Sequence, residues 1–410
     1  MDKLLLLGNN YHVDSLLKCA QDRGIYVIVT DNLPVEESPV KKMADEYWDI
    51  SITDIDLLEK EIRNNGVNGI LCGASELCMD VNIELCKRLD LPCYVPENAW
   101  EITGDKVKFK NACRKHNVPV AEDFSIDEEF SKSDLEKISY PVIIKPIDGC
   151  SSIGIHVCNN ETELIEGYKD AINHSNKKQA MIEKYYSGKD VMLMFFFKNG
   201  KAEYVESCEL IGDKKNGRLF VNATNPSKHV DYFKKEIFGS LYDLFSDLNC
   251  NEGLACVQGI MTDGKFVVIE MNYRFPGCSF MQQGYACDLV LNYIYPGYAK
   301  NNLELVTYPA LNAYDVWLRC GKISRIDGIE KIKELIPGVM FDRAREVGDV
   351  IVENSGMRQM YSQILFFGDV NDDDMRRYME IVNKYLVVED QNGNDMVCRY
   401  KIENGRAIQL

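Results

Sequence analysis

Strands and helices alternate along the first hundred residues, and this pattern constrains the fold more than any other feature of the sequence. Predicted strands cover 4–7, 26–29 and 70–72, and predicted helices cover 13–20 and 78–89. Connections this short between strands imply a parallel sheet covered by helices. Gly8 is the only glycine in the turn after the first strand. The Gly-x-Gly-x-x-Gly fingerprint of a dinucleotide-binding fold is therefore missing.

The chain has 410 residues, which is enough for two to four domains. Pro92 and Pro96 break the first pattern and place a boundary near residue 96. From 141 to 271 the sequence is rich in strands, with one helix predicted over 237–248. A last segment, from about 300 to the end, mixes short strands with another helix.

Charge and apolar patterning exclude several classes of partner. There are 64 acidic and 47 basic residues, so the net charge is −17, which disfavours nucleic acid and anionic membranes. No apolar run approaches the roughly 20 residues of a membrane span. The 15 cysteines are scattered and no secretory signal is recognised. The sequence predicts a cytoplasmic protein with reduced thiols.

A loop of glycines and serines follows a strand that ends at Lys145. The loop, residues 148–154, contains Ser151, Ser152 and Gly154, and a second strand is predicted directly after it. Backbone N–H groups of such a loop can hold phosphate oxygens, and glycine permits their close approach. The Gly-Lys-Ser/Thr ending of a P-loop is absent. A phosphate-binding loop and a plain β-hairpin with a surface lysine both remain open at this point.

The segment 182–191 is predicted to run from a strand through a short connector into another strand. The connector backbone could bond a purine edge, Tyr185 and Tyr186 could close over a flat ring, and Asp190 could accept hydrogen bonds from ribose hydroxyls. Taken alone, the segment favours an ordinary loop with two half-buried tyrosines.

The strand predicted over 266–272 carries the most informative polar residues. Since residues i and i+2 of a strand share a face, Glu270 and Asn272 point the same way, and Arg274 extends the row. A carboxylate and an amide oxygen suit Mg²⁺, and an arginine can stabilise a developing anion. The alternative is a strand whose polar residues face solvent.

Gln258 lies on the preceding strand and could complete this metal site. A two-residue turn on Asp263-Gly264 would pair position 258 with position 269 and so leave Glu270 on the opposite face from Gln258. A three-residue loop would pair 258 with 270. The metal interpretation therefore predicts a bulged or three-residue connection in this hairpin.

In this order, the motifs resemble those of the ATP-grasp carboxylate ligases, closest to the branch of biotin carboxylase, the carbamoyl-phosphate synthase large subunit and phosphoribosylglycinamide synthetase. The resemblance extends over nearly the whole chain and implies a multidomain fold of α/β and α+β type. It implies a Rossmann-like N-terminal domain at 1–96, a two-lobed ATP-grasp domain at 97–300 with a mobile lobe at about 117–185, and a small α+β domain at 301–410.

The resemblance also implies roles for residues that match the family's motifs. The implied ATP-binding residues are Lys106, Lys145, Ser151, Ser152, Gly154, Glu183, Tyr185, Tyr186 and Asp190. The implied ligands of Mg²⁺ or Mn²⁺ are Gln258, Glu270 and Asn272, and the implied catalytic residues are Arg274 and Lys145. The acceptor pocket would be lined by the segment 218–229, with Arg218 and His229 as candidate contacts. Cys150 is interpreted as a small loop residue rather than a reactive thiol.

The implied activity is an ATP- and Mg²⁺-dependent ligase that forms an acyl phosphate from a small carboxylate and transfers it to an amine, as an amino-acid ligase would. A second enzyme hypothesis is phosphorylation of a one-carbon acid, or ligation to a phosphoribosyl amine. A third, of another class, is an ATP-sensing module without turnover. The joint presence of Lys106, Lys145, Glu270, Asn272 and Arg274 argues against the third. The expected partners are small molecules, and a homodimer is the expected assembly.

Overall fold

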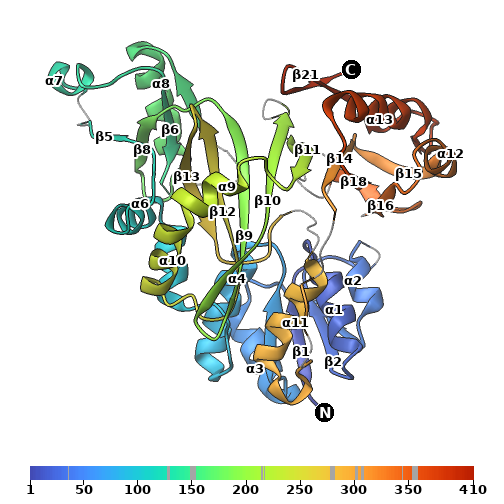
Figure 1. Cartoon of the computed structure of the whole chain (residues 1–410). Coiled ribbons are helices and arrows are strands. Elements are labelled where there is room, and N and C mark those ends of the chain that lie inside the picture. Colours follow the sequence, from blue (N-terminus) through green and yellow to red (C-terminus); the bar gives the residue numbers. More distant parts are fainter. Residues whose placement is uncertain are drawn as a thin grey trace.

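The fold is taken from a computed structural model of the chain. It describes residues 1–35, 37–126, 130–147, 154–213, 216, 218–277, 282–300, 303–305, 309–343, 345–352 and 359–410. Figure 1 shows a parallel sheet with its helices at one end of the molecule, a long central sheet, a small projecting sheet beside α8, and a C-terminal part that carries α13.

The predicted parallel sheet of the first hundred residues is present. Its strand order is β3-β2-β1-β4 and all neighbours run parallel. The strands are β1 (Lys3–Leu7), β2 (Tyr26–Thr30), β3 (Glu46–Trp48) and β4 (Gly69–Cys72), and the helices are α1 (Val13–Gln21), α2 (Pro39–Met43), α3 (Ile55–Asn65) and α4 (Glu76–Leu89). The apolar residues of β1, β2 and β4 are almost fully buried, as expected for strands covered by helices on both faces.

A nine-stranded antiparallel sheet forms the centre of the molecule. Its order is β13-β12-β9-β10-β11-β14-β18-β16, and β20 also pairs with β14. The strands are β9 (Lys189–Lys198), β10 (Lys201–Asp213), β11 (Arg218–Asn225), β12 (Gly253–Thr262), β13 (Lys265–Asn272), β14 (Leu311–Leu318), β16 (Met340–Arg343), β18 (Met360–Phe367) and β20 (Val397–Cys398). Because β11 pairs with β14, this sheet continues across the boundary predicted at 300.

A separate four-stranded antiparallel sheet has the order β5-β8-β6-β7. Its strands are β5 (Asp123–Phe124), β6 (Val142–Pro146), β7 (His156–Cys158) and β8 (Ala180–Lys184), and its helices are α7 (Lys132–Leu135) and α8 (Glu161–Asn173). It has a small apolar cluster of its own, which includes Val142, Ile144, Leu164 and Ile182. The predicted strands on either side of the glycine-serine loop therefore pair as β6 and β7.

The remaining elements cover or connect these sheets. They are α5 (Glu97–Gly104), α6 (Lys106–Lys115), α9 (Val230–Glu236), α10 (Phe238–Asp247), α11 (Gln283–Ile294), the 3-10 helix η2 (Pro296–Tyr298), α12 (Ile329–Leu335), α13 (Asp372–Tyr385), β15 (Gly321–Asp327), β17 (Val350–Ile351), β19 (Val387–Asp390), β21 (Tyr400–Glu403) and β22 (Arg406–Gln409). Among the described residues, no helix combines the length and apolarity needed to cross a membrane.

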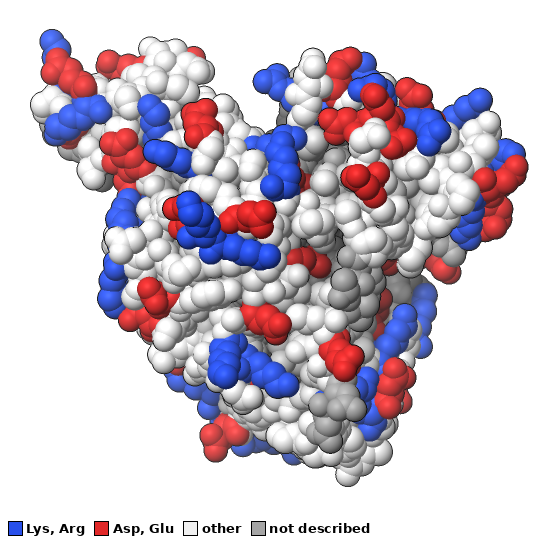
Figure 2. Space-filling model, viewed as in Figure 1, with Lys and Arg blue, Asp and Glu red and all other residues white. Residues whose placement is uncertain are grey.

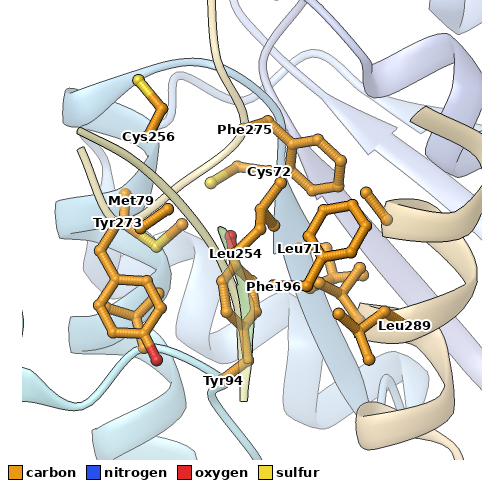
Figure 3. Close-up of a cluster of buried hydrophobic side chains, with 14 of the residues drawn as sticks. Leu71, Cys72, Met79, Tyr94, Phe196, Leu254, Cys256, Tyr273, Phe275 and Leu289 are labelled. Atoms are coloured by element: carbon orange, nitrogen blue, oxygen red, sulfur yellow. The ribbon is translucent and has the colours of Figure 1, made fainter. Parts of the chain in front are cut away.

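One hydrophobic core joins the parallel sheet to the central sheet. Figure 3 shows Leu71 of β4, Phe196 of β9, Leu254 of β12 and Leu289 of α11 in a single cluster. Since all four side chains are almost fully buried, they hold the two sheets in a fixed relation.

Gly253 lies where the ring of Tyr94 packs against the start of β12. Its φ of +89° is one that L side chains rarely adopt, and a Cβ added there would lie 2.1 Å from the Tyr94 ring. We expect Gly253→Ala to lower the free energy of unfolding by roughly 2–4 kcal/mol, measured from urea midpoints. Gly239→Ala, in open space on α10, is the control and should leave stability unchanged or raise it by up to about 1 kcal/mol. Equal losses in both variants would contradict this account.

Asp315 of β14 is a buried carboxyl in the central sheet. Gln363 Nε2 donates to its Oδ1 at 2.9 Å, and its Oδ2 has no hydrogen-bond partner among the described residues. Burial, with a smaller contribution from Asp342, raises the pKa of Asp315 to about 7. The folded protein therefore holds a proton that the unfolded chain releases, so stability falls as pH rises toward 7.

We expect Asp315→Asn to remove this pH dependence. The gain in unfolding free energy relative to wild type should be larger at pH 8 than at pH 5 by about 1–3 kcal/mol. Urea unfolding at the two pH values measures it, and a gain that is equal at both would show that Asp315 is ionised throughout.

Candidate functional site

The hairpin of β12 and β13 contains the bulge that the metal interpretation predicted. Thr262 pairs with Lys265 across the two-residue turn, Gly259 pairs with Val268, and the register then shifts so that Gln258 faces Glu270. The extra residue is Ile269. Without the bulge, Gln258 would pair with Ile269, and the Glu270 side chain would lie on the other face of the hairpin. The prediction of a bulged connection is confirmed.

The polar side chains at this end of the hairpin form a hydrogen-bonded row. Asn272 Nδ2 donates to Glu270 Oε1 at 3.0 Å, and Arg274 Nη2 donates to Asn272 Oδ1 at 3.3 Å. Arg274 Nη1 also donates to the carbonyl oxygen of Phe275 at 2.7 Å. The Arg274 Nε is buried and has no hydrogen-bond partner among the described residues. The guanidinium is thus held in place through both terminal nitrogens, while its Nε–H is not bonded by any described residue.

Register places a fourth predicted residue on the same face of the central sheet. In β9, Met192 pairs with Gln258 and Asp190 pairs with Ile260. Because alternate residues of paired strands share a face, Asp190, Gln258, Glu270 and Asn272 all project from one side of the sheet. The arrangement offers carboxylate and amide oxygens, which are ligands suited to Mg²⁺.

The row ends at the carboxyl edge of the parallel sheet. Arg274 forms an ion pair with Glu76, in the first turn of α4, and the ring of His12 lies 2.9 Å from the carbonyl oxygen of Pro276. Residues 8–12 follow β1 and residues 73–76 follow β4, so the row meets the sheet between these two strands. The strand order reverses between β1 and β4, and such a switch point is where open α/β sheets bind ligands.

Lys145, at the end of β6, belongs to a buried ion network. Its Nζ lies 2.5 Å from Glu183 Oε2, and Lys110 Nζ lies 2.6 Å from Glu183 Oε1. Lys110 also pairs with Asp123, which in turn pairs with Arg114. Burial opposes the ionisation of Glu183, but Lys145 and Lys110 outweigh it and lower its pKa. The structure therefore places the Glu183 carboxylate between two lysines.

The structure describes Lys106 and Gly154, two of the other residues predicted to bind phosphate. Lys106 begins α6, whose N-cap Asp105 accepts from the backbone N–H groups of Val107 and Lys108 at 3.0 and 3.1 Å. Gly154 has a φ of +71°, and a Cβ there would lie 2.9 Å from His174. Ser151 and Ser152 lie outside the described residues.

The connector after β8 packs against the central sheet. Thr262 Oγ1 donates to the carbonyl oxygen of Ser187 at 2.9 Å, and a Cβ on Gly188 would lie 2.2 Å from the carbonyl oxygen of Met261. Tyr185 and Tyr186 are half-buried. Tyr186 lines an open hollow of about 690 Å³ together with Arg114, Asn117, Val118, Val120, Ala121, Glu122 and Asp123.

Arg218 is the first residue of β11, whereas His229 follows the other end of the strand, so the two do not lie together. At about 3.3 Å per residue, the strand alone separates its ends by roughly 23 Å. The Arg218 guanidinium stacks on Trp317, 4.9 Å from the ring centroid, and donates to Gln359 at 3.0 Å. His229 is the N-cap of α9.

Sequence reasoning missed Lys110, Asp123 and Glu76, which contact the predicted residues. Lys110 and Glu183 are 73 positions apart, and Glu76 and Arg274 are 198 apart. No local pattern links such pairs. In the described part of the chain, no cluster of three or more His, Cys, Asp or Glu side chains could hold a metal ion. The predicted ligand set instead combines one carboxylate, Glu270, with the amides of Gln258 and Asn272.

Figure 2 shows acidic and basic side chains interspersed over one face of the molecule. The surface is hollowed between the part that carries α8 and the part that carries α13.

Comparison with known proteins identifies the central region. Residues 103–278 match the ATP-grasp domain, so the chain contains an ATP-grasp domain and the predicted resemblance is confirmed. A curated relative, the 2-oxoglutarate carboxylase small subunit of Hydrogenobacter thermophilus, is 25% identical over 226 residues, covering 52% of this chain and 46% of the relative. The chain spans about half the length of the curated relatives it matches.

Solved structures show the same fold over nearly the whole chain. The biotin carboxylase domain of the H. thermophilus 2-oxoglutarate carboxylase, solved with MgADP and bicarbonate, superposes with a TM-score of 0.77 at 17% identity, covering 95% of this chain and 91% of that one. An L-amino acid ligase from Bacillus licheniformis gives 0.70 at 17% identity, covering 96% and 99%. The predicted fold class is confirmed, and the predicted enzyme class and cofactors, ATP and Mg²⁺, are those typical of the ATP-grasp superfamily.

Glu183 offers a direct test of the buried network. Its folded pKa lies below the unfolded value, so its contribution to stability is present above about pH 4.5 and is lost as pH falls through the folded pKa. We expect Glu183→Gln to lower the unfolding free energy by about 3–5 kcal/mol at pH 7, because two buried lysines lose their shared partner. Glu136→Gln, at an exposed pair, should change it by less than about 0.5 kcal/mol.

Urea midpoints measured from pH 7 down to pH 4 check both expectations. The difference between wild type and Glu183→Gln should narrow below about pH 4.5. A difference that stays constant over this range would contradict the ionised state assigned to Glu183.

Proposed function

Because residues 103–278 form an ATP-grasp domain, we propose that the chain is an ADP-forming ligase that activates a small-molecule carboxylate with ATP and transfers the acyl group to an amine or similar nucleophile. The observation that carries the proposal is the bulged pairing that sets Gln258 opposite Glu270. It sets the side-chain oxygens of Gln258, Glu270 and Asn272 on the same face as Asp190, in a row that Arg274 continues to the switch point of the parallel sheet.

The residues present fit a bound Mg²⁺ ion. Gln258, Glu270 and Asn272 would hold it, and it would neutralise phosphate charge during transfer. The donor set is made of oxygens, as a hard cation requires, and Arg274, whose Nη2 donates to Asn272 Oδ1, would supply positive charge to an anion next to this set.

In the first step, a carboxylate oxygen attacks the γ-phosphorus of ATP. The bond to the bridging oxygen breaks, ADP leaves, and an acyl phosphate forms. In the second step, the nucleophile attacks the acyl carbon, phosphate leaves, and the amine loses a proton. Lys106 and Lys145 would neutralise charge on the phosphates, and Arg274 would bind the developing anion. These residues act by positioning and electrostatic stabilisation, and the two steps use no side-chain nucleophile.

The proposal favours amino acids as the substrates, so that the protein would be an amino-acid ligase. The L-amino acid ligase matched over nearly the whole chain supports it. The biotin carboxylase domain, whose structure holds bicarbonate, supports a one-carbon acid as the second candidate. The proposal also includes a cytoplasmic location, the predicted domain division, and a homodimer, since that carboxylase domain was solved as a dimer.

Release of ADP by the purified protein tests the proposal. With ATP, Mg²⁺ and pools of amino acids and small carboxylates, we expect ADP release that depends on one acid and one amine. Arg274→Ala and Glu270→Ala should each lower the rate at least about 100-fold, because both act on the transferring phosphoryl group. Arg325→Ala, an exposed arginine on β15, is the control and should keep the wild-type rate.

The other outcomes separate the alternatives. ADP release with a carboxylate alone would favour the one-carbon acid candidate. Clear MgATP binding without turnover in any pool would overturn the ligase proposal in favour of an ATP-sensing module. Absence of ATP binding would overturn the assignment of the site.

A further inference from the structure

Lys110 is a buried cation with no role in the proposed chemistry. It lies on α6 one turn after Lys106, and only 3% of its surface is exposed. Lysine is among the residues least often buried, and a buried charge must be paired. Its partners are Glu183 of β8 and Asp123 of β5, so Lys110 joins one helix to two strands.

Glu183 divides its carboxylate between two lysines. Oε1 accepts from Lys110 at 2.6 Å and Oε2 contacts Lys145 at 2.5 Å. Both lysines and Glu183 are buried, so solvent screens their interaction little. The position of the Lys145 ammonium therefore depends on where the Glu183 carboxylate is held.

The charges of this cluster do not cancel. Lys145, Lys110 and Arg114 carry three positive charges, and Glu183 and Asp123 carry two negative charges. With Lys110 removed, Glu183 would face Lys145 alone and Asp123 would face Arg114 alone. The positive charge of Lys145 would then be cancelled by its own partner.

The cluster also contacts β13, the strand that carries the proposed metal ligands Glu270 and Asn272. The backbone N–H of Val268 donates to the carbonyl oxygen of Pro119 at 2.8 Å, and Val120 bridges to Val268. Asp123 follows three residues later, and Val268 lies two residues before Glu270. The ion network therefore has a fixed place relative to β13.

We propose that Lys110 is a positioning residue which, through Glu183, holds Lys145 in the place and with the net charge needed to bind nucleotide phosphate. The inference rests on the proposed function, since it takes Lys145 as a phosphate ligand. Lys110 touches Glu183, not the nucleotide. Its effect must therefore pass through Lys145 and concern the phosphates rather than the base.

Calorimetric titration of Lys110→Met with ATP, ADP and adenosine tests this. We expect the affinity for MgATP and MgADP to fall about tenfold, as for the loss of one charge-assisted contact, while adenosine binding is unchanged. Lys110→Arg should restore most of the loss. Lys115→Met, on the same helix but paired with Asp247 at the surface, should match wild type. An equal loss for all three ligands would overturn the inference, because that is the result of a merely structural role.

A double-mutant cycle asks whether Lys110 acts through Lys145. In a Lys145→Met background, Lys110→Met should cause no further loss of ATP affinity, whereas an added tenfold loss would overturn the inference. Should Lys110→Met fail to fold, Lys110→Gln removes the same charge, keeps a polar side chain and carries the same expectations. If the wild-type protein binds no ADP, the proposed function is wrong. If wild type and Lys110→Met bind ATP and ADP equally well, the proposed function stands and the inference about Lys110 is wrong.

Discussion

The geometry of the candidate site depends on one extra residue in β13. The bulge at Ile269 turns the hairpin so that Gln258 and Glu270 share a face, which a regular two-residue hairpin would forbid. The site therefore rests on a backbone register rather than on side-chain flexibility. Arg274 continues the same row and is fixed at its far end by Glu76, so one strand carries the row from the central sheet to the parallel sheet.

Two packing arrangements support this register. A shared core of Leu71, Phe196 and Leu254 holds the parallel and central sheets together, so the end of β13 has a defined place against β4. The sheet that carries Lys145 has a smaller core of its own and meets the rest through backbone contacts near Val268 and a buried ion network. Lys145, the proposed phosphate ligand, and Gln258 and Glu270, the proposed metal ligands, therefore belong to two sheets with separate cores.

Much of this was predictable from sequence because it follows local periodicity. The parallel sheet follows from apolar strands that alternate with helices. The bulge near Gln258 follows from the two-residue period of a strand together with the metal interpretation. The ion pairs of Lys110 and Glu76 join positions far apart in the chain, and no periodic signal encodes them. The predicted boundary at 300 came from the pattern of elements and the resemblance, and neither shows that β11 and β14, on either side of it, pair in one sheet.

The central claim is that a carboxylate is activated as an acyl phosphate. The most direct test supplies the accepted acid with both carboxyl oxygens labelled with ¹⁸O and analyses the released phosphate by mass spectrometry. Attack by the carboxylate on the γ-phosphorus predicts one ¹⁸O atom in each phosphate formed, in proportion to ADP. Phosphate that carries no label while product accumulates would contradict the account.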